Sequence, residues 1–230
     1  MQRTSTGFLR QCFRVLSRLE SCVETRARLH ALEGRAPGRL PDHEVPDHFR
    51  RAAVLLLVGC HENQPCIVLS ERAAHLRAHA AEIALPGGRI EPGESPEQGA
   101  VREANEEVGV DTNAVELFGR LDEAWSKARN HVVPVVGWYH APMDDLSPTS
   151  NEVARVFLTP LARIARPEAH RIDIAEINGV TYENDVLDAD TFDIYGLTAD
   201  LVMDLLAWLG GTERDRIPIR RAELQRSLER

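Results

Sequence analysis

The chain has 230 residues, of which 43% are hydrophobic and 27% charged, and its formal net charge at pH 7 is −9. The length fits one domain with extensions, and the composition excludes a wholly disordered or fibrous protein. The acidic balance disfavours a general nucleic-acid binder, and no apolar run approaches the ~20 residues that a membrane-spanning helix requires.

The first 50 residues predict an extension to the main domain. Apolar residues from Leu9 to Val23 recur at helical spacing, so residues 6–33 are expected to form an amphipathic helix that packs on its own domain. A role of this helix in binding a partner is the alternative. Prolines within 35–46 then predict a linker. We divide the chain into this extension (1–49), a main domain (50–210) and a charged tail (211–230).

The main domain mixes strands with helices. Strands are predicted, in chain order, at 52–59, 65–71, 115–121, 131–140 and 152–158, followed by a hairpin within 171–183 that turns at Asn178 and Gly179. Helices are predicted at 96–108 and 198–209. This mixture indicates the α+β class, in which helices cover a sheet.

The four cysteines are Cys12, Cys22, Cys60 and Cys66, and their spacing matches neither a CxxC pair nor a zinc site. Cys60 and Cys66 flank the loop between the first two predicted strands and could face each other across it. The pattern favours four reduced thiols. The N-terminus shows no apolar core of a secretory signal, and we therefore expect a cytoplasmic protein.

The helix at 96–108 brings three carboxylates together. At ~100° per residue, Glu103, Glu106 and Glu107 share an arc of about 100° on one face, beside Arg102. Like charges at this spacing are unfavourable unless something neutralises them, and a hard divalent cation such as Mg²⁺ suits an all-oxygen cluster. The alternative to a metal site is that these glutamates form a solvent-exposed acidic face without a specific function.

The glycines and charges around this helix resemble the Nudix box, Gly-x5-Glu-x7-Arg-Glu-U-x-Glu-Glu-x-Gly-U, in which U is aliphatic. The specified positions are filled by Gly88, Glu94, Arg102, Glu103, Ala104, Glu106, Glu107, Gly109 and Val110. The resemblance implies a Nudix fold, an α/β/α sandwich with a mixed central sheet and the box as loop-helix-loop. It also implies hydrolysis of a diphosphate linked to a nucleoside.

The resemblance implies roles for the box residues. The metal, Mg²⁺ or Mn²⁺, would be held by Glu103, Glu107, Glu106 and the carbonyl of Gly88. The catalytic residues would be Glu106, Arg102 and Glu103, with Arg102 orienting Glu103, and Glu94 would support them near the helix entrance. The residue that deprotonates water varies among Nudix enzymes, so Glu152 and the pair Asp144 and Asp145 are candidates outside the box.

The stretch before the box resembles the signature of coenzyme A diphosphatases within the Nudix superfamily. Its matching positions are Ser70, Arg72, Leu76, Arg77, His79, Glu82, Ile83, Pro86, Gly87 and Gly88. The implied substrate contacts are Arg72, Arg77, His79 and Gly87. The chain departs from the signature at Ala81, where Gly is usual, and at Leu85, where Phe is usual; further on, Tyr195 stands where Trp is common.

These resemblances lead to a functional hypothesis. The protein would use a divalent metal to hydrolyse coenzyme A or acyl-coenzyme A to adenosine 3',5'-bisphosphate and phosphopantetheine or its acyl form. The alternatives are a Nudix hydrolase for ADP-ribose, NADH or a nucleoside triphosphate, and a non-catalytic Nudix regulator. The expected partner is this small molecule, with no nucleic acid, no membrane and a homodimer as the candidate assembly.

Overall fold

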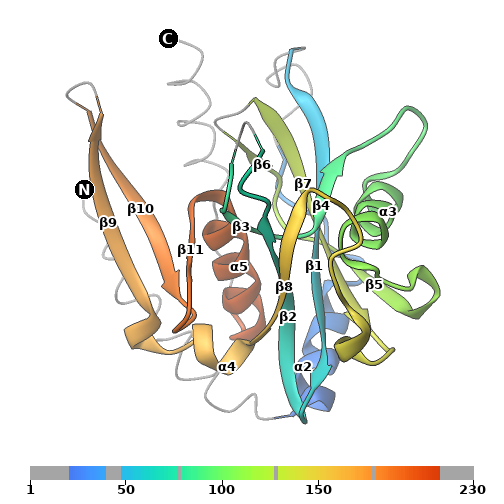
Figure 1. Ribbon diagram of the computed structural model, residues 1–230. Coiled ribbons are helices and arrows are strands. Elements are labelled where there is room, and N and C mark those ends of the chain that lie inside the picture. The colour runs from blue at the N-terminus through green and yellow to red at the C-terminus, as the bar shows by residue number, and fades with distance from the viewer. Residues whose placement is uncertain (1–20, 40–47, 77–78, 127–128, 178–179, 213–230) are drawn as a thin grey trace.

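The computed structural model describes residues 21–39, 48–76, 79–126, 129–177 and 180–212. Within them, a mixed sheet of eight strands is built around β1 (Arg50–His61). β1 pairs in parallel with β7 (Asn130–Tyr139) on one side and antiparallel with β2 (Gln64–Arg72) on the other. Figure 1 shows this sheet at the centre of the molecule.

The remaining strands of the sheet extend these pairs. They are β3 (Ile83–Ala84) and β8 (Val153–Pro160) on β2, β4 (Gly87–Arg89) on β1, and β5 (Val115–Arg120) and β6 (Ala124–Trp125) on β7. β4 matters for function because it carries the first glycine of the box alongside the centre of the sheet.

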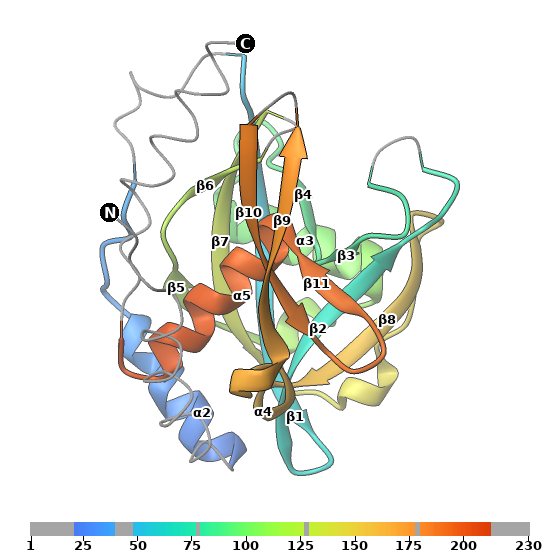
Figure 2. The ribbon, with the colours of Figure 1, turned by 90° about the vertical axis from the view of Figure 1, so that its left-hand side faces the viewer.

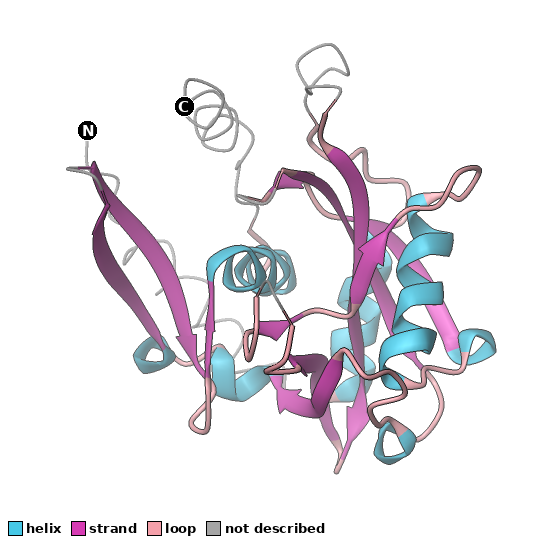
Figure 3. Ribbon diagram, turned by 45° about the horizontal axis from the view of Figure 1, so that its top comes forward, coloured by secondary structure: helices cyan, strands magenta, loops and turns pink. Residues whose placement is uncertain are grey.

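Helices cover both faces of the sheet. α3 (Pro96–Val108) lies on one face, and α5 (Gly196–Leu209) and α2 (Cys22–Leu29) lie on the other (Figures 1 and 2). A second sheet lies beyond α5 and consists of β9 (His170–Ile177), β10 (Val180–Asp188) and β11 (Asp193–Tyr195). Figure 3 shows the layers in order: this sheet, α5, the central sheet and α3. The short helices are η1 (His30–Leu32), η3 (Thr112–Ala114), η4 (Met143–Asp145), α4 (Leu161–Ile164) and η5 (Pro167–Ala169).

The apolar run in β1 explains why this strand is central. Side chains alternate between the two faces of a strand, so Leu55 and Leu57 enter the core under α3, while Leu56 and Val58 enter the core under α5. All four are fully buried. A strand that is apolar on both faces has to be covered on both faces, and the two helix layers provide that cover.

The ends of α3 are specified by its own sequence. The Ser95 hydroxyl accepts from the N–H of Gln98 at 3.2 Å, and the Gln98 side chain accepts from the N–H of Ser95 at 2.8 Å. This reciprocal pair is a capping box. Gly109 ends the helix in the left-handed region, at φ 74°. The predicted helix at 96–108 is therefore confirmed at both ends.

The other predicted elements of the main domain are also confirmed, with ends shifted by a few residues; the turn residues 178 and 179 of the hairpin lie outside the described residues. The sequence reading missed β3, β4, β6 and β11. Each contains only two or three residues, which is too short for an alternating pattern to be recognised.

The single helix predicted at 6–33 is wrong at Ser21, whose extended backbone (φ −127°, ψ 143°) makes it the N-cap of α2. Residues 6–20 lie outside the described part of the chain. In α2, Leu29 is fully buried, but Val23 is 81% exposed. The prediction that Val23 belongs to the packed stripe is therefore wrong: it lies on the far side of α2 from Thr25 and Leu29, which face the core. Arg26 ties the helix to β5 by a salt bridge of 2.8 Å to Glu116. The domain limits at 49 and 210 stay a prediction.

The prediction of four reduced thiols is wrong for two of the cysteines. Cys22 of α2 and Cys60 of β1 form a disulfide across 38 residues of sequence. The packing of α2 against the sheet brings them together, and the spacing of cysteines in the sequence does not predict such a pair. Cys66 lies opposite Gly59 in the β1–β2 ladder and is a buried free thiol. Burial raises the pKa of this thiol to about 11, so Cys66 is an unreactive core residue.

None of the described helices has both the length and the apolar character that crossing a membrane would require.

Candidate active site

Two glycines of β4 lie directly against two glutamates of α3. The N–H of Gly87 donates to Oε2 of Glu107 at 3.0 Å. A Cβ atom placed on Gly88 would lie 2.5 Å from the carboxyl carbon of Glu103, which is closer than side-chain atoms pack. Because β4 is held to β1 at Ala53 and Val54, these glycines have a fixed position. They allow the carboxylates of α3 to reach the backbone at the edge of the sheet.

Arg102 organises the acidic groups around the helix. Its Nε donates to Oε1 of Glu94 at 2.8 Å, and its Nη1 donates to Glu103 at 3.0 Å and to Glu106 at 3.1 Å. Its Nη2 donates to the carbonyl of Arg89 at 2.9 Å. The hydrogen bond from Arg102 lowers the pKa of Glu94. One guanidinium thus holds three carboxylates, and its planar fork suits that task better than an ammonium would.

The two glutamates nearest β4 are the electrostatically unfavourable ones. Glu107 is 7% exposed, and burial raises its pKa to about 7, although the N–H of Gly87 opposes that rise. Burial also raises the pKa of Glu103, against the opposing effect of Arg102. Desolvation penalises a charged carboxylate wherever it is not fully compensated. The site therefore concentrates negative charge that the protein itself does not balance.

A loop carboxylate joins this cluster. Glu152, just before β8, contributes to the raised pKa of both Glu103 and Glu107, so it lies close to them. It also pairs with Arg72 of β2, with 3.6 Å between Nη2 and Oε2. The positive charge of Arg72 in turn opposes the rise in the pKa of Glu107. The end of β2 and the start of β8 thus add one cation and one anion to the face of α3.

The other predicted residues are placed differently. Asp144 pairs with His61 at 3.4 Å, at the β1–β2 hairpin, which is the opposite end of β1 from the segment that pairs with β4. His79 is exposed and pairs with Glu82 at 2.7 Å. Arg77 lies outside the described residues. Of the loop carboxylates named from the sequence, Glu152 is the one that the structure brings to the box, because β8 pairs with β2 up to Arg72.

The residues present fit a divalent metal ion by their chemistry. Glu103, Glu106 and Glu107 supply hard oxygen ligands, and the raised pKa values of the two buried ones indicate uncompensated charge. In the described part of the chain, no three acidic, histidine or cysteine side chains are already gathered as a metal site. Arg102 holds Glu103 and Glu106, while Glu107 faces Gly87. Each of these hydrogen bonds uses one carboxylate oxygen, so the other oxygen of each glutamate could bind a metal.

The buried Glu107 makes a testable contribution to stability. Its pKa is about 7 in the folded protein against an ordinary value of 4.5, so the unfolded chain releases this proton at lower pH. The folded state is progressively disfavoured as pH rises from 4.5 to 7, by about 3 kcal/mol in total, and the loss is complete above 7. We expect Glu107→Gln to remove this loss, so that the metal-free variant is more stable than the metal-free wild type at pH 8.

The measurement is urea unfolding in EDTA at pH 5 and pH 8. The difference in unfolding free energy between variant and wild type should grow in favour of the variant at the higher pH. An unchanged difference between the two pH values would contradict the burial effect.

Comparison with known proteins identifies the family. The NUDIX domain model matches residues 48–177. Proteins named "Uncharacterized Nudix hydrolase NudL" from Yersinia pestis (strain Pestoides F) and Yersinia pseudotuberculosis serotype O:1b (strain IP 31758) are each 35% identical over 158 residues, covering 68% of this chain and 78% of the relative. The chain therefore belongs to the Nudix hydrolase family, whose members use divalent metal ions.

Solved structures also resemble the chain. RenU, a Nudix hydrolase from M. smegmatis, has a TM-score of 0.43 at 24% identity, over 50% of this chain and 73% of that one. The NUDIX domain of Shewanella oneidensis NrtR, solved with ADP ribose, has a TM-score of 0.41 at 24% identity, over 53% of this chain and 79% of that one.

Proposed function

We propose that this Nudix hydrolase cleaves the diphosphate of coenzyme A or acyl-coenzyme A, giving adenosine 3',5'-bisphosphate and phosphopantetheine or its acyl form. The observation that carries the proposal is the connection between the box and the segment before it. Arg72 belongs to the coenzyme A diphosphatase signature and reaches toward Glu107 and Glu152 beside the box. The residues that resemble a substrate signature therefore adjoin the acidic site.

The chain's own residues suggest how the reaction is arranged. Glu103, Glu106, Glu107 and the carbonyl of Gly88 are proposed to hold Mg²⁺ or Mn²⁺, which when bound neutralises phosphate charge and lowers the pKa of a water molecule. Arg102 orients Glu103 by the 3.0 Å hydrogen bond. Arg72 offers a guanidinium to the diphosphate, a group that binds phosphate oxygens in pairs. A box glutamate or Glu152 takes the proton from water.

The departures from the signature have different consequences. Leu85 is 5% exposed and belongs to the core under α5, so this change concerns packing. Ala81 adopts φ 58°, in the region that favours glycine. Its N–H donates to the carbonyl of Arg72 at 3.0 Å, which keeps this backbone in place. The glycine of the signature is thus replaced without moving the chain away from Arg72.

The direct test is to incubate the protein with Mg²⁺ or Mn²⁺ and a panel of coenzyme A, acetyl-coenzyme A, ADP-ribose, NADH and nucleoside triphosphates. Mass spectrometry then identifies the products. Adenosine 3',5'-bisphosphate from coenzyme A supports the proposal, whereas faster cleavage of another panel member would select that alternative. A protein that binds a panel member and cleaves none would be the non-catalytic regulator. Homodimerisation stays a prediction.

Arg77→Ala is expected to show whether Arg77 contacts the ribose phosphate or the diphosphate of coenzyme A. If Arg77 contacts the ribose phosphate, its loss removes a charge-assisted contact of roughly 1.5–3 kcal/mol, and KM rises about 10- to 100-fold for coenzyme A. KM for dephospho-coenzyme A, which lacks that phosphate, should hardly change. The matched control is Arg72→Ala, which should raise both KM values equally. Equal effects of Arg77→Ala on both ligands would contradict the ribose-phosphate role.

A further inference from the structure

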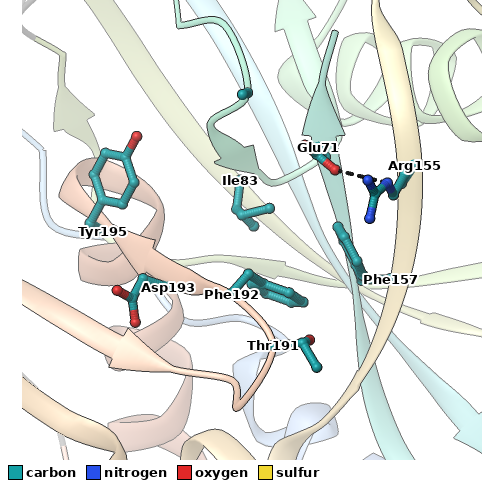
Figure 4. Close-up of a pocket in the computed structure, with 9 residues that line it drawn as sticks. Glu71, Ile83, Arg155, Phe157, Thr191, Phe192, Asp193 and Tyr195 are labelled. Atoms are coloured by element: carbon teal, nitrogen blue, oxygen red, sulfur yellow. Dashed lines mark ion pairs between the residues drawn. The ribbon is translucent and has the colours of Figure 1, made fainter. Parts of the chain in front are cut away.

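A pocket of about 340 Å³ lies on the side of the central sheet that faces α5. It opens between the ends of β2, β3 and β8 and the segment at β11 (Figure 4). The box helix α3 lies on the other face of this sheet, and the residues of the box do not line the pocket. This pocket is therefore additional to the carboxylate site described above.

One part of the pocket wall is apolar, whereas Glu71, Arg155, Thr191 and Asp193 make the rest of it polar. The rings of Phe157 and Phe192 pack against each other with their centroids 4.3 Å apart, and Ile83 beside them is 8% exposed. Tyr195 lies on the opposite side of the pocket from Arg155 (Figure 4) and is 44% exposed. Such a surface suits a ligand group with methyl or methylene carbons, because contact with it removes apolar area from water.

The charges around the pocket disfavour an anionic ligand group. Among the described lining residues, the two carboxylates are those of Glu71 and Asp193, and the one guanidinium is that of Arg155. Glu71 pairs with Arg155 at 3.3 Å, and Asp193 pairs with Arg171 at 2.7 Å. Among the described lining residues, the one guanidinium is thus already paired with a carboxylate. A phosphate placed here would have to compete for that guanidinium, whereas an uncharged group would not.

The pocket lies back to back with the carboxylate site. Glu71 and Arg72 are consecutive residues of β2, so their side chains point to opposite faces of the sheet. Glu71 lines the pocket, and Arg72 lies beside Glu152 and Glu107. Ala81 also lines the pocket, and its N–H donates a hydrogen bond to the carbonyl of Arg72. A ligand that occupied both places would have to pass round the end of β2.

We propose that this pocket binds the uncharged arm of the substrate, on the side of the diphosphate away from the nucleoside. Under the proposed function, on which this inference rests, that arm is pantetheine or acyl-pantetheine, a chain of amides and methylenes without charge. The nucleoside arm carries the additional ribose phosphate, for which the described lining residues offer only an arginine that is already paired with Glu71. The methyl group of Ala81 then shapes the subsite at a position where the family signature has none.

Two variants test the subsite by binding, without turnover. Thr191 is an exposed lining residue, so Thr191→Trp fills the pocket without disturbing the core. Phe192→Ala removes part of the apolar wall instead. The matched control is Thr112→Trp, which places the same side chain at an exposed position of η3 outside the pocket lining. Thermal unfolding establishes that each variant is folded.

The probes are 4'-phosphopantetheine and adenosine 3',5'-bisphosphate, titrated separately by calorimetry with Mg²⁺. We expect Thr191→Trp or Phe192→Ala to weaken 4'-phosphopantetheine binding at least 10-fold, about 1.4 kcal/mol, with adenosine 3',5'-bisphosphate and the control unchanged. The inference would be overturned if the variants weakened the binding of both probes equally or of the nucleotide alone. It would also be overturned if neither variant weakened binding, or if the wild type did not bind 4'-phosphopantetheine. If the wild type does not cleave coenzyme A, the proposed function is rejected instead. The titration measures binding only, so its outcome does not depend on cleavage.

Discussion

Glu107→Gln is expected to lower turnover at least ~100-fold while leaving the fold intact. The amide has nearly the volume of the carboxylate and can still accept the hydrogen bond from Gly87 that the structure shows at 3.0 Å. What the variant loses is the negative oxygen that is proposed to hold the metal beside Glu103, so the expected loss is in metal binding and in the reaction it supports. The measurement is kcat with saturating Mg²⁺ on whichever substrate the panel identifies.

The matched control for this variant is Glu97→Gln, the same substitution on the same helix. Glu97 pairs with Arg120 at 2.6 Å, away from the box glutamates, so the control should keep turnover within a small factor of the wild type. Near-wild-type turnover of Glu107→Gln at saturating Mg²⁺ would reject its proposed role as a metal ligand. The stability of the metal-free variant at pH 8 provides an independent check that the substituted helix is folded.

Gly87→Ala is expected to destabilise the protein by about 3 kcal/mol or more. An added Cβ would lie 2.4 Å from the carbonyl oxygen of Ala53 and 2.6 Å from the Cα of Val54. Both are backbone atoms of the central strand and cannot turn aside as a side chain would. Overpacking of this kind typically costs about 1–3 kcal/mol, and φ 153° adds backbone strain of order 1–3 kcal/mol for a residue with a side chain.

Gly93→Ala separates strain from overpacking. Gly93 also has a positive φ, 89°, but nothing lies within 4 Å of its added Cβ. Urea unfolding should therefore show a loss of only about 1–2 kcal/mol for this control. Similar losses in the two variants would mean that β4 moves away from β1 to admit the methyl group, and that Gly87 does not hold Glu107 at a fixed backbone position.

The helix that carries the acidic groups could be predicted from the sequence because the residues that determine its ends lie close together along the chain. Ser95, Gln98 and Gly109 specify the ends of α3 through contacts within five residues, and the helical repeat places the glutamates on one arc. The apolar run within residues 52–59 likewise indicated a strand, which the structure shows as β1. The family resemblance rested on the same short-range spacing, which is why the class of the fold could be predicted and is confirmed.

The differences among the glutamates depend on the tertiary structure. Glu106 and Glu107 lie at the two ends of the predicted arc, yet the side chain of Glu106 is 55% exposed while Glu107 is 7% exposed. Only the docking of β4, a strand of three residues, decides which of them is buried and has a raised pKa. Helical geometry alone treats the two carboxylates alike.

Contacts between distant segments could not be predicted for the same reason. The selection of Glu152 rather than Asp144 follows from the pairing of β8 with β2, and the Cys22–Cys60 disulfide follows from the packing of α2 on the sheet. The sequence contains the local preferences that determine helix ends, strand character and the spacing of the acidic groups. Burial, register and long-range partners depend instead on free energies shared by the whole core, and these exist only once the sheet and its helices are assembled.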